Sequence, residues 1–186
     1  MANLAGYAKN NGYDVHCFTS ERQKGTVGIT SNSIPLHIVD DICSNNIFQS
    51  LISETTLGIG IGEAWRFDKE TIDKFNGRLL DYMGIPLPHY RGGAHFSWMI
   101  LMGCKDGGCY LETVDENTEQ GVCDTGLVIK SKEYQFPDTV RIPQDYFDYA
   151  FIEDMGFFIE FFKEMKNGKE FEIRSINVKG GFKANE

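Results

Sequence analysis

Residues 92–117 have the sequence GGAHFSWMILMGCKDGGCYLETVDEN, and this stretch decides the predicted fold. The mostly apolar residues that follow His95 predict one strand, and residues 105–108 predict a short turn. A second strand follows the turn and ends in polar residues that include Asp115 and Asn117. Antiparallel pairing about the turn places these two residues roughly opposite His95. The stretch therefore predicts a β-hairpin with an imidazole and a carboxylate or amide at one end.

Composition predicts one folded domain over residues 1–186, with a polar tail from about residue 179. The chain has 186 residues, of which 41% are hydrophobic, which is enough for a packed core. Its formal net charge of -9 argues against general binding to nucleic acid or to anionic membranes, because phosphate contacts need clustered Lys and Arg. The N-terminus lacks the pattern of a signal peptide, and no apolar run is long enough to cross a membrane. We therefore expect a cytoplasmic protein.

The five cysteines predict reduced thiols, since an odd number without an export signal does not suggest a disulfide framework. Cys104, Cys109 and Cys123, with His95, raise the possibility of zinc. Their spacing does not match the common paired zinc motifs, and small apolar residues on a hairpin are the simpler interpretation. No metal and no cofactor is predicted.

The periodicity of the chain predicts an α+β domain, with an antiparallel sheet and about three helices packed on it. The three main helices are expected near 43–53, 69–83 and 145–166. A short helix over 2–10 is also predicted. Further strands are expected at 13–19, 26–30, 57–65, 127–134, 140–142 and 170–178.

Two glycine-containing segments could bind a small ligand. Residues 58–62 form a G-x-G-x-G run, but this run lacks the remaining residues of a phosphate-binding or dinucleotide-binding loop, so a glycine-rich strand is the simpler interpretation. Arg91, followed by Gly92 and Gly93, could present a guanidinium and backbone N–H groups to an anion. Together with Trp98, these three residues are the candidate ligand-binding residues.

Cys43 is the candidate nucleophile, because it stands at the predicted start of a helix. A helix N-terminus favours a thiolate, whereas the adjacent Asp40 and Asp41 disfavour a second anion, so the net effect is left open. A thiolate needs a base, which His95 could supply, and the base needs an orienting group, which Asp115 or Asn117 could supply. The order Cys, His, Asp/Asn is thus present in the chain.

These residues resemble those of papain-like cysteine peptidases and amidases, in particular the bacteriocin-processing, NlpC-type and CHAP-type families. The resemblance covers the Cys43 helix start and residues 95–117. His37 stands six residues before Cys43 (43 − 6), where the papain and bacteriocin-processing groups carry the glutamine of the oxyanion hole. The resemblance implies a thiol-dependent hydrolase or acyl-transfer enzyme that acts on an amide or ester bond. Its substrate would be a peptide or a small amide or ester.

A non-catalytic binding protein is the alternative. A compact, acidic and aromatic-rich chain is also typical of an immunity protein or a phage-type inhibitor, whose carboxylates would steer it to a basic protein partner. A small-ligand binder that uses the glycine segment and Arg91 is a third hypothesis. The sequence leaves these alternatives open.

Overall fold

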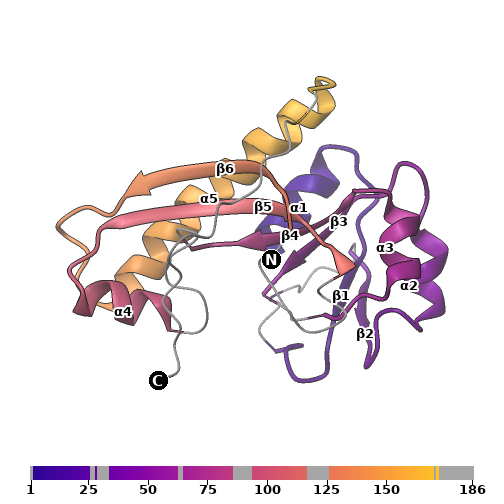
Figure 1. Cartoon of the computed structure of the whole chain (residues 1–186), viewed down its shortest axis with the longest axis horizontal. Helices are drawn as coiled ribbons and strands as arrows, with labels where there is room; N and C mark the ends of the chain where they lie inside the picture. Colours follow the sequence, from indigo (N-terminus) through magenta and orange to yellow (C-terminus); the bar gives the residue numbers. More distant parts are fainter. Residues whose placement is uncertain are drawn as a thin grey trace. The chain divides into compact units, whose positions relative to one another are not determined.

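The computed structural model describes residues 2–25, 28, 34–62, 65–85, 94–116, 126–169 and 171. Within them, five helices and six strands follow one another along the chain (Figure 1). The elements are α1 (Ala2–Asn10), β1 (Cys17–Thr19), β2 (Leu36–Ile38), α2 (Asn46–Leu51), β3 (Gly58–Ile61), α3 (Lys69–Phe75), β4 (Leu79–Met83), α4 (His95–Leu101), β5 (Asp106–Thr113), β6 (Val128–Gln135) and α5 (Pro143–Lys166).

The contacts of the chain divide it into two compact units. The first unit comprises residues 1–81 and 113–126, and the second comprises residues 82–112 and 127–186. The boundary falls inside β4. The prediction of a single domain over 1–186 stays a prediction.

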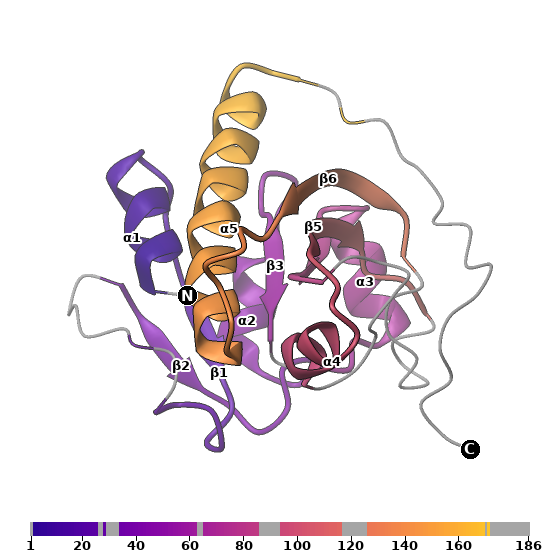
Figure 2. The same ribbon diagram turned by 90° about the vertical axis from the view of Figure 1, so that its left-hand side faces the viewer.

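The first unit contains a parallel pair of short strands, β1 and β2, which lie side by side in Figure 2. Phe18 of β1 is the register partner of His37 of β2. Backbone hydrogen bonds of 2.9 Å at both ends, Cys17 N–H to Pro35 and Val39 N–H to Thr19, extend the pairing. This parallel pair, together with the antiparallel pair of the second unit, makes the sheets mixed, so the predicted antiparallel sheet is wrong.

The starts of α2 and α3 in the first unit are set by side-chain caps. The Asn45 side chain accepts a 3.0 Å hydrogen bond from the Phe48 N–H at the start of α2, and Asp68 accepts one of 2.8 Å from Thr71 N–H in α3. A carboxylate or amide at this position satisfies a backbone donor that the helix itself cannot. The core that these helices cover is apolar and includes Val39, Ile42, Phe67, Phe75 and Leu79.

Strand β3 confirms the interpretation of the G-x-G-x-G run as a glycine-rich strand in close contact with its neighbours. A Cβ added at Gly58 would lie 2.6 Å from Leu79 Cδ1, and one added at Gly60 would lie 2.6 Å from Asp81 Oδ1. A larger residue at either position would force the Leu79 or Asp81 side chain to move. In the first unit, β3 therefore neighbours β4 tightly; β4 continues into the second unit, where β5 is its neighbour.

In the second unit, β5 and β6 form an antiparallel ladder with a register shift between Leu111 and Glu112. Most of β5 is buried, and α5 packs along β6 (Figure 1). A second apolar cluster links α4, the end of β6 and the start of α5; its buried members are Met99, Phe136, Val140, Tyr146 and Ala150.

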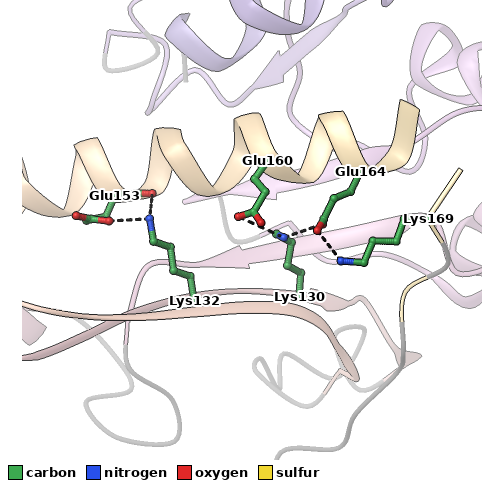
Figure 3. Close-up of polar contacts among 6 residues, drawn as sticks. All are labelled: Lys130, Lys132, Glu153, Glu160, Glu164 and Lys169. Atoms are coloured by element: carbon green, nitrogen blue, oxygen red, sulfur yellow. Dashed lines mark hydrogen bonds and ion pairs between the residues drawn. The ribbon is translucent and has the colours of Figure 1, made fainter. Parts of the chain in front are cut away.

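Ion pairs join β6 to α5 within the second unit (Figure 3). Lys132 Nζ lies 2.7 Å from Glu153 Oε2, and Lys130 Nζ lies 2.7 Å from Glu164 Oε2 and 3.6 Å from Glu160. Lys130 also stands over the ring of Phe157, 5.7 Å from its centroid. The lysine stems cover apolar surface while their ammonium groups reach the acidic side of the helix.

The predicted hairpin over 92–117 is wrong in its first half, because residues 95–101 form the helix α4. Met99 is fully buried while Phe96 and Ile100 are half-buried, and Trp98 and Leu101 are exposed. This spacing is helical, and a short apolar run does not distinguish a strand from a helix by periodicity alone. β5 pairs with β6 instead, so His95 does not face Asp115 across a hairpin.

Two other elements differ from the prediction. The helix expected over 69–83 ends at Phe75, because Asn76 and Gly77 adopt left-handed φ values of 48° and 78°. The chain then continues as β4, whose Leu79 and Leu80 are both buried, and a strand buried on two faces imitates a helical stripe. Residues 140–142 form no strand.

The helices at 2–10 and 145–166 and the strand at 127–134 are confirmed by α1, α5 and β6. The expected helix over 43–53 is confirmed in part by α2, which begins only at Asn46. Similarly, the strand expected at 13–19 is confirmed only over Cys17–Thr19, which form β1. The predicted strands at 26–30 and 170–178 and the polar tail lie outside the described residues, apart from single positions.

Candidate functional site

Cys43 lies in a turn before α2 rather than on the helix. Its thiol is 3.4 Å from the Arg66 carbonyl oxygen, to which it donates, and 3.4 Å from the Asp68 N–H, from which it accepts. Burial raises the pKa of the Cys43 thiol; hydrogen bonds from the Asp68 backbone and Thr71 act against this effect, while the charges of Asp68 and Asp41 add to it. Cys43 is therefore held as a neutral thiol.

His95 is the first residue of α4 and belongs to the second unit, whereas Cys43 belongs to the first. Its ring contacts the ring of Phe96, with 4.0 Å between the centroids. Burial lowers the pKa of His95, so the imidazole is neutral near neutral pH. Its Nε2 is shielded from solvent and has no hydrogen-bond partner within the described part of the chain.

The other predicted site residues belong to different segments of the chain, and some lie outside the described residues. His37 lies on β2, where its ring contacts His16 and Phe18. Asp115 follows β5 and is half-buried, and the Trp98 side chain is exposed on α4. Arg91, Gly92, Gly93 and Asn117 lie outside the described residues.

A group of buried and half-buried ionisable side chains in the second unit was not predicted from the sequence. It consists of Tyr82 on β4, Cys109 on β5 and Asp154 on α5, and we call it the Asp154 cluster. Burial raises the pKa of Asp154 to about 6, while the neighbouring Tyr82 hydroxyl and Cys109 thiol favour its carboxylate and limit that rise. Burial also raises the pKa of the Tyr82 hydroxyl and of the Cys109 thiol, so both remain proton donors.

Lys132 and Glu153, both half-buried, act on this cluster through their charges. The charge of Lys132 favours the Asp154 carboxylate, and that of Glu153 disfavours it. The Glu153 hydrogen bond in turn raises the pKa of Lys132. Asp154 can thus gain or lose a proton between pH 5 and 7, which is the property expected of a proton carrier and also of a structural polar group in a core.

The sequence carried a signal for Asp154 that was missed. By sequence alone, Phe147 and Phe151 look like members of an apolar stripe on α5, but both are exposed, whereas Tyr146, Ala150, Phe157 and Phe161 are buried. Asp154 is four residues after Ala150 and three before Phe157, so it falls on the buried face. With the stripe in its correct phase, an acidic residue inside it would have been apparent.

The described residues contain no group of three or more His, Cys, Asp or Glu side chains that could hold a metal ion. The four cysteines among them, Cys17, Cys43, Cys104 and Cys109, are free thiols.

No protein-family model matches the sequence, and no curated protein matches it either. Solved structures do match the fold. A sugar 3N-formyltransferase in the presence of dTDP and 5-N-formyl-THF has 18% identity and a TM-score of 0.68, over 97% of this chain and 65% of its own. The fold is that of the formyltransferases.

Two further solved structures match the same fold. A 4-N formyltransferase from Francisella tularensis has 17% identity and a TM-score of 0.68, over 97% of this chain and 72% of its own. An N-formyltransferase from Helicobacter canadensis, in complex with folinic acid and dTDP-3-aminofucose, has 16% identity and a TM-score of 0.66, over 97% of this chain and 66% of its own. This chain thus spans about two thirds of the length of these structures.

This fold overturns the functional hypotheses drawn from the sequence. The resemblance to papain-like enzymes is wrong, because the structures that match this fold are formyltransferases. A thiol-dependent hydrolase with a peptide, amide or ester substrate is wrong for the same reason. The immunity or inhibitor alternative, with its basic protein partner, is not supported either. No helix among the described residues is both long and apolar enough to span a bilayer.

Proposed function

We propose that this chain transfers a formyl group from a formyl-tetrahydrofolate to an amino group of a nucleotide-linked sugar. The observation that carries the proposal is the match of 97% of the chain to three N-formyltransferases, one of them a sugar 3N-formyltransferase, at TM-scores of 0.66 to 0.68. One of those structures holds dTDP with 5-N-formyl-THF, and another holds folinic acid with dTDP-3-aminofucose. A donor and an acceptor of these classes define the reaction.

The chemistry sets requirements on the site. The acceptor amine attacks the formyl carbon, a new C–N bond forms, and the C–N bond to the folate breaks. A proton leaves the amine and one reaches the folate nitrogen, so a proton carrier must stand near the reacting atoms. Donors must also stabilise the negative charge that develops on the formyl oxygen.

Two groups of this chain are candidates within the proposal. His95 is neutral near neutral pH because burial lowers its pKa, so it is able to accept a proton. Arg91, Gly92 and Gly93 would hold a phosphate of the nucleotide, since a chain with a net charge of -9 needs a local cation to bind that anion. A cytoplasmic location, where thiols stay reduced, is part of the proposal.

The test separates binding from chemistry. Calorimetry with dTDP and with folinic acid measures the two binding events. Mass spectrometry of a dTDP-linked aminosugar incubated with a formyl-tetrahydrofolate detects the added formyl group. Binding of both ligands and formation of the formamido sugar support the proposal; binding without product overturns the transferase assignment, and no binding overturns the whole proposal.

The variant Arg91→Gln is matched by Arg141→Gln, whose side chain is exposed beside α5. We expect the first to weaken dTDP binding at least tenfold and the second to leave it unchanged. Equal affinities would remove Arg91 from the site. A His95→Gln variant with unchanged kcat would remove His95 as the proton acceptor.

A further inference from the structure

His16 and His37 form a pair of imidazoles on one face of the β1–β2 strand pair. His16 and Phe18 are two residues apart on an extended segment, so their side chains point to the same face. His37 is the register partner of Phe18, and its ring stacks on the Phe18 ring at a centroid distance of 4.7 Å. The parallel pairing of β1 and β2 therefore brings the two histidines together.

The two rings meet edge to edge through their nitrogens. His16 Nδ1 lies 3.1 Å from His37 Nε2, the ring planes differ by 9°, and the centroids are 5.4 Å apart. The difference between these distances, 2.3 Å (5.4 − 3.1), is about twice the distance from an imidazole centre to its nitrogen. The two nitrogens thus lie on the line between the ring centres, and each lone-pair direction points at the other ring.

This geometry is that of an N–H···N hydrogen bond with one shared proton. A neutral imidazole has one donor nitrogen and one acceptor nitrogen, so one ring donates and the other accepts. Two nitrogens that bind one metal ion would instead turn their lone pairs toward a common point beside both rings. The arrangement therefore fits a hydrogen bond and not chelation.

Among the described residues, few other charged groups lie near the histidine pair. The Asp14 carboxylate lies 3.7 Å from the outer nitrogen of His16, Nε2. Among the described residues, α1 contributes Ala5 against Cys17, and α2 contributes the ring of Phe48 against Phe18, 5.3 Å between centroids. Burial lowers the pKa of His37, and the neighbouring His16 lowers it further.

We propose that His16 and His37 act as a single-proton switch: the pair binds one proton with its hydrogen bond intact, and a second proton breaks that bond and loosens β1 from β2. With both rings charged, an N–H on each ring faces the other across 3.1 Å, so no acceptor remains and two like charges repel. This inference concerns the stability of the first unit and does not depend on the proposed formyl transfer.

The first experiment is a pH titration of the histidine side chains by long-range 1H–15N NMR in the full chain, from pH 8 to 4.5. We expect the two imidazoles to titrate in steps separated by about one pH unit or more, as coupled groups do. Two midpoints that coincide, with uncoupled titration curves, would overturn the switch. His95→Gln assigns the third described imidazole and serves as the control.

Variants test the coupling itself. In His16→Gln, the His37 midpoint should rise, because the neighbouring charge is gone; an unchanged midpoint overturns the proposal. If that variant fails to fold, His16→Asn gives the same reading on His37. A merely structural histidine would not shift its neighbour's midpoint.

Amide exchange measures the consequence for the strands. The N–H groups of Cys17 and Val39 bond across the β1–β2 pair. After correction for intrinsic rates, their exchange in the wild-type chain should rise about tenfold or more below the lower titration step. In His16→Gln the rise should be absent. Equal exchange profiles in the two proteins would show that the imidazole pair does not control the strands.

Discussion

Asp154 in the second unit and His37 in the first are both ionisable groups packed beside other side chains, and burial shifts their pKa values in opposite directions. It raises the pKa of Asp154 to about 6 and lowers that of His37. The cause is the same, because burial disfavours whichever form is charged. The same physical effect should therefore lower the stability of the second unit as the pH rises and lower that of the first unit as the pH falls.

The largest expected effect comes from opening the apolar packing near Asp154. Phe157 is fully buried on α5, and its ring centroid lies 6.5 Å from that of Tyr82. Phe157→Ala should lower the free energy of unfolding by about 3–5 kcal/mol and admit water near the cluster. Phe147→Ala, on the exposed side of the same helix, should cost under about 1 kcal/mol. Urea denaturation measures both, and equal losses would show that α5 packs differently.

Asp154→Asn should change the pH dependence of the second unit. The pKa of Asp154 is about 6 in the folded chain against an ordinary value of 3.8, so the folded state binds this proton more tightly than the unfolded state does. Its stabilising contribution is complete below pH 3.8 and is lost as the pH rises to 6, a loss of about 3 kcal/mol. The amide keeps the neutral form, so the variant should gain up to that amount at pH 7 and little at pH 4.

The two tryptophans allow each unit to be followed separately. Trp65 belongs to the first unit and Trp98 to the second. In a Trp65→Phe background, Trp98 fluorescence reports urea unfolding of the second unit with and without Asp154→Asn. Asp148→Asn, at an exposed position of α5, is the matched control. A variant that loses stability at pH 7 would show that Asp154 is a structural acceptor whose charge the fold requires.

Lys132→Met tests whether the charge of Lys132 limits the rise in the pKa of Asp154. The Lys132 ammonium pairs with Glu153 at 2.7 Å and favours the Asp154 carboxylate. Because the pair is partly exposed, its loss should cost only about 1 kcal/mol. The pKa of Asp154 should nevertheless rise above its wild-type value. The carboxyl 13C shift of Asp154 against pH measures this, with Lys163→Met as the exposed control on α5; an unchanged midpoint would remove Lys132 from the electrostatics of the cluster.

The stability of the first unit should depend on pH in the opposite direction. The folded-state pKa of His37 is lowered, so its contribution to stability is present above the unfolded value of about 6.5 and is lost as the pH falls. In a Trp98→Phe background, the urea midpoint reported by Trp65 should therefore decrease below pH 6.5. His37→Gln should flatten that decrease. A midpoint that falls equally in both proteins would assign the acid sensitivity to other groups.

The sequence allowed α5 and β6 to be predicted because their patterns are long and are bounded by Pro143 and by Asn167 and Gly168. It did not allow α4 to be predicted, since the seven residues from His95 to Leu101 are too few to separate a helix from a strand. One part of the candidate site depended on the same segment. The predicted hairpin placed His95 opposite Asp115 and Asn117, and that arrangement disappears because β5 pairs with β6.

The fold itself required the structure. The parallel pairing of β1 with β2 joins residues 17–19 to 36–38, and each strand has only three residues, so no periodic signal marks them. Asp154 was within reach of sequence reasoning, because it lies on a helix that was correctly predicted. The His16–His37 contact was not, since it depends on the register of that short parallel pair.

Cys43 gives the smallest expected effect. It applies the same rule, that burial disfavours the charged form, to a half-buried thiol. Burial raises its pKa, and Asp68 and Asp41 add to this by charge, so iodoacetamide should alkylate Cys43 more slowly at pH 7 than it alkylates a free thiol such as glutathione. Asp41→Asn removes one of these charges and should speed the reaction slightly, whereas Asp73→Asn on the exposed side of α3 should not. Mass spectrometry of the alkylated peptides gives both rates. A Cys43 that reacts faster than glutathione below pH 7 would show that the hydrogen bonds from Asp68 and Thr71 outweigh burial. Burial would then not be what sets the protonation state of this thiol.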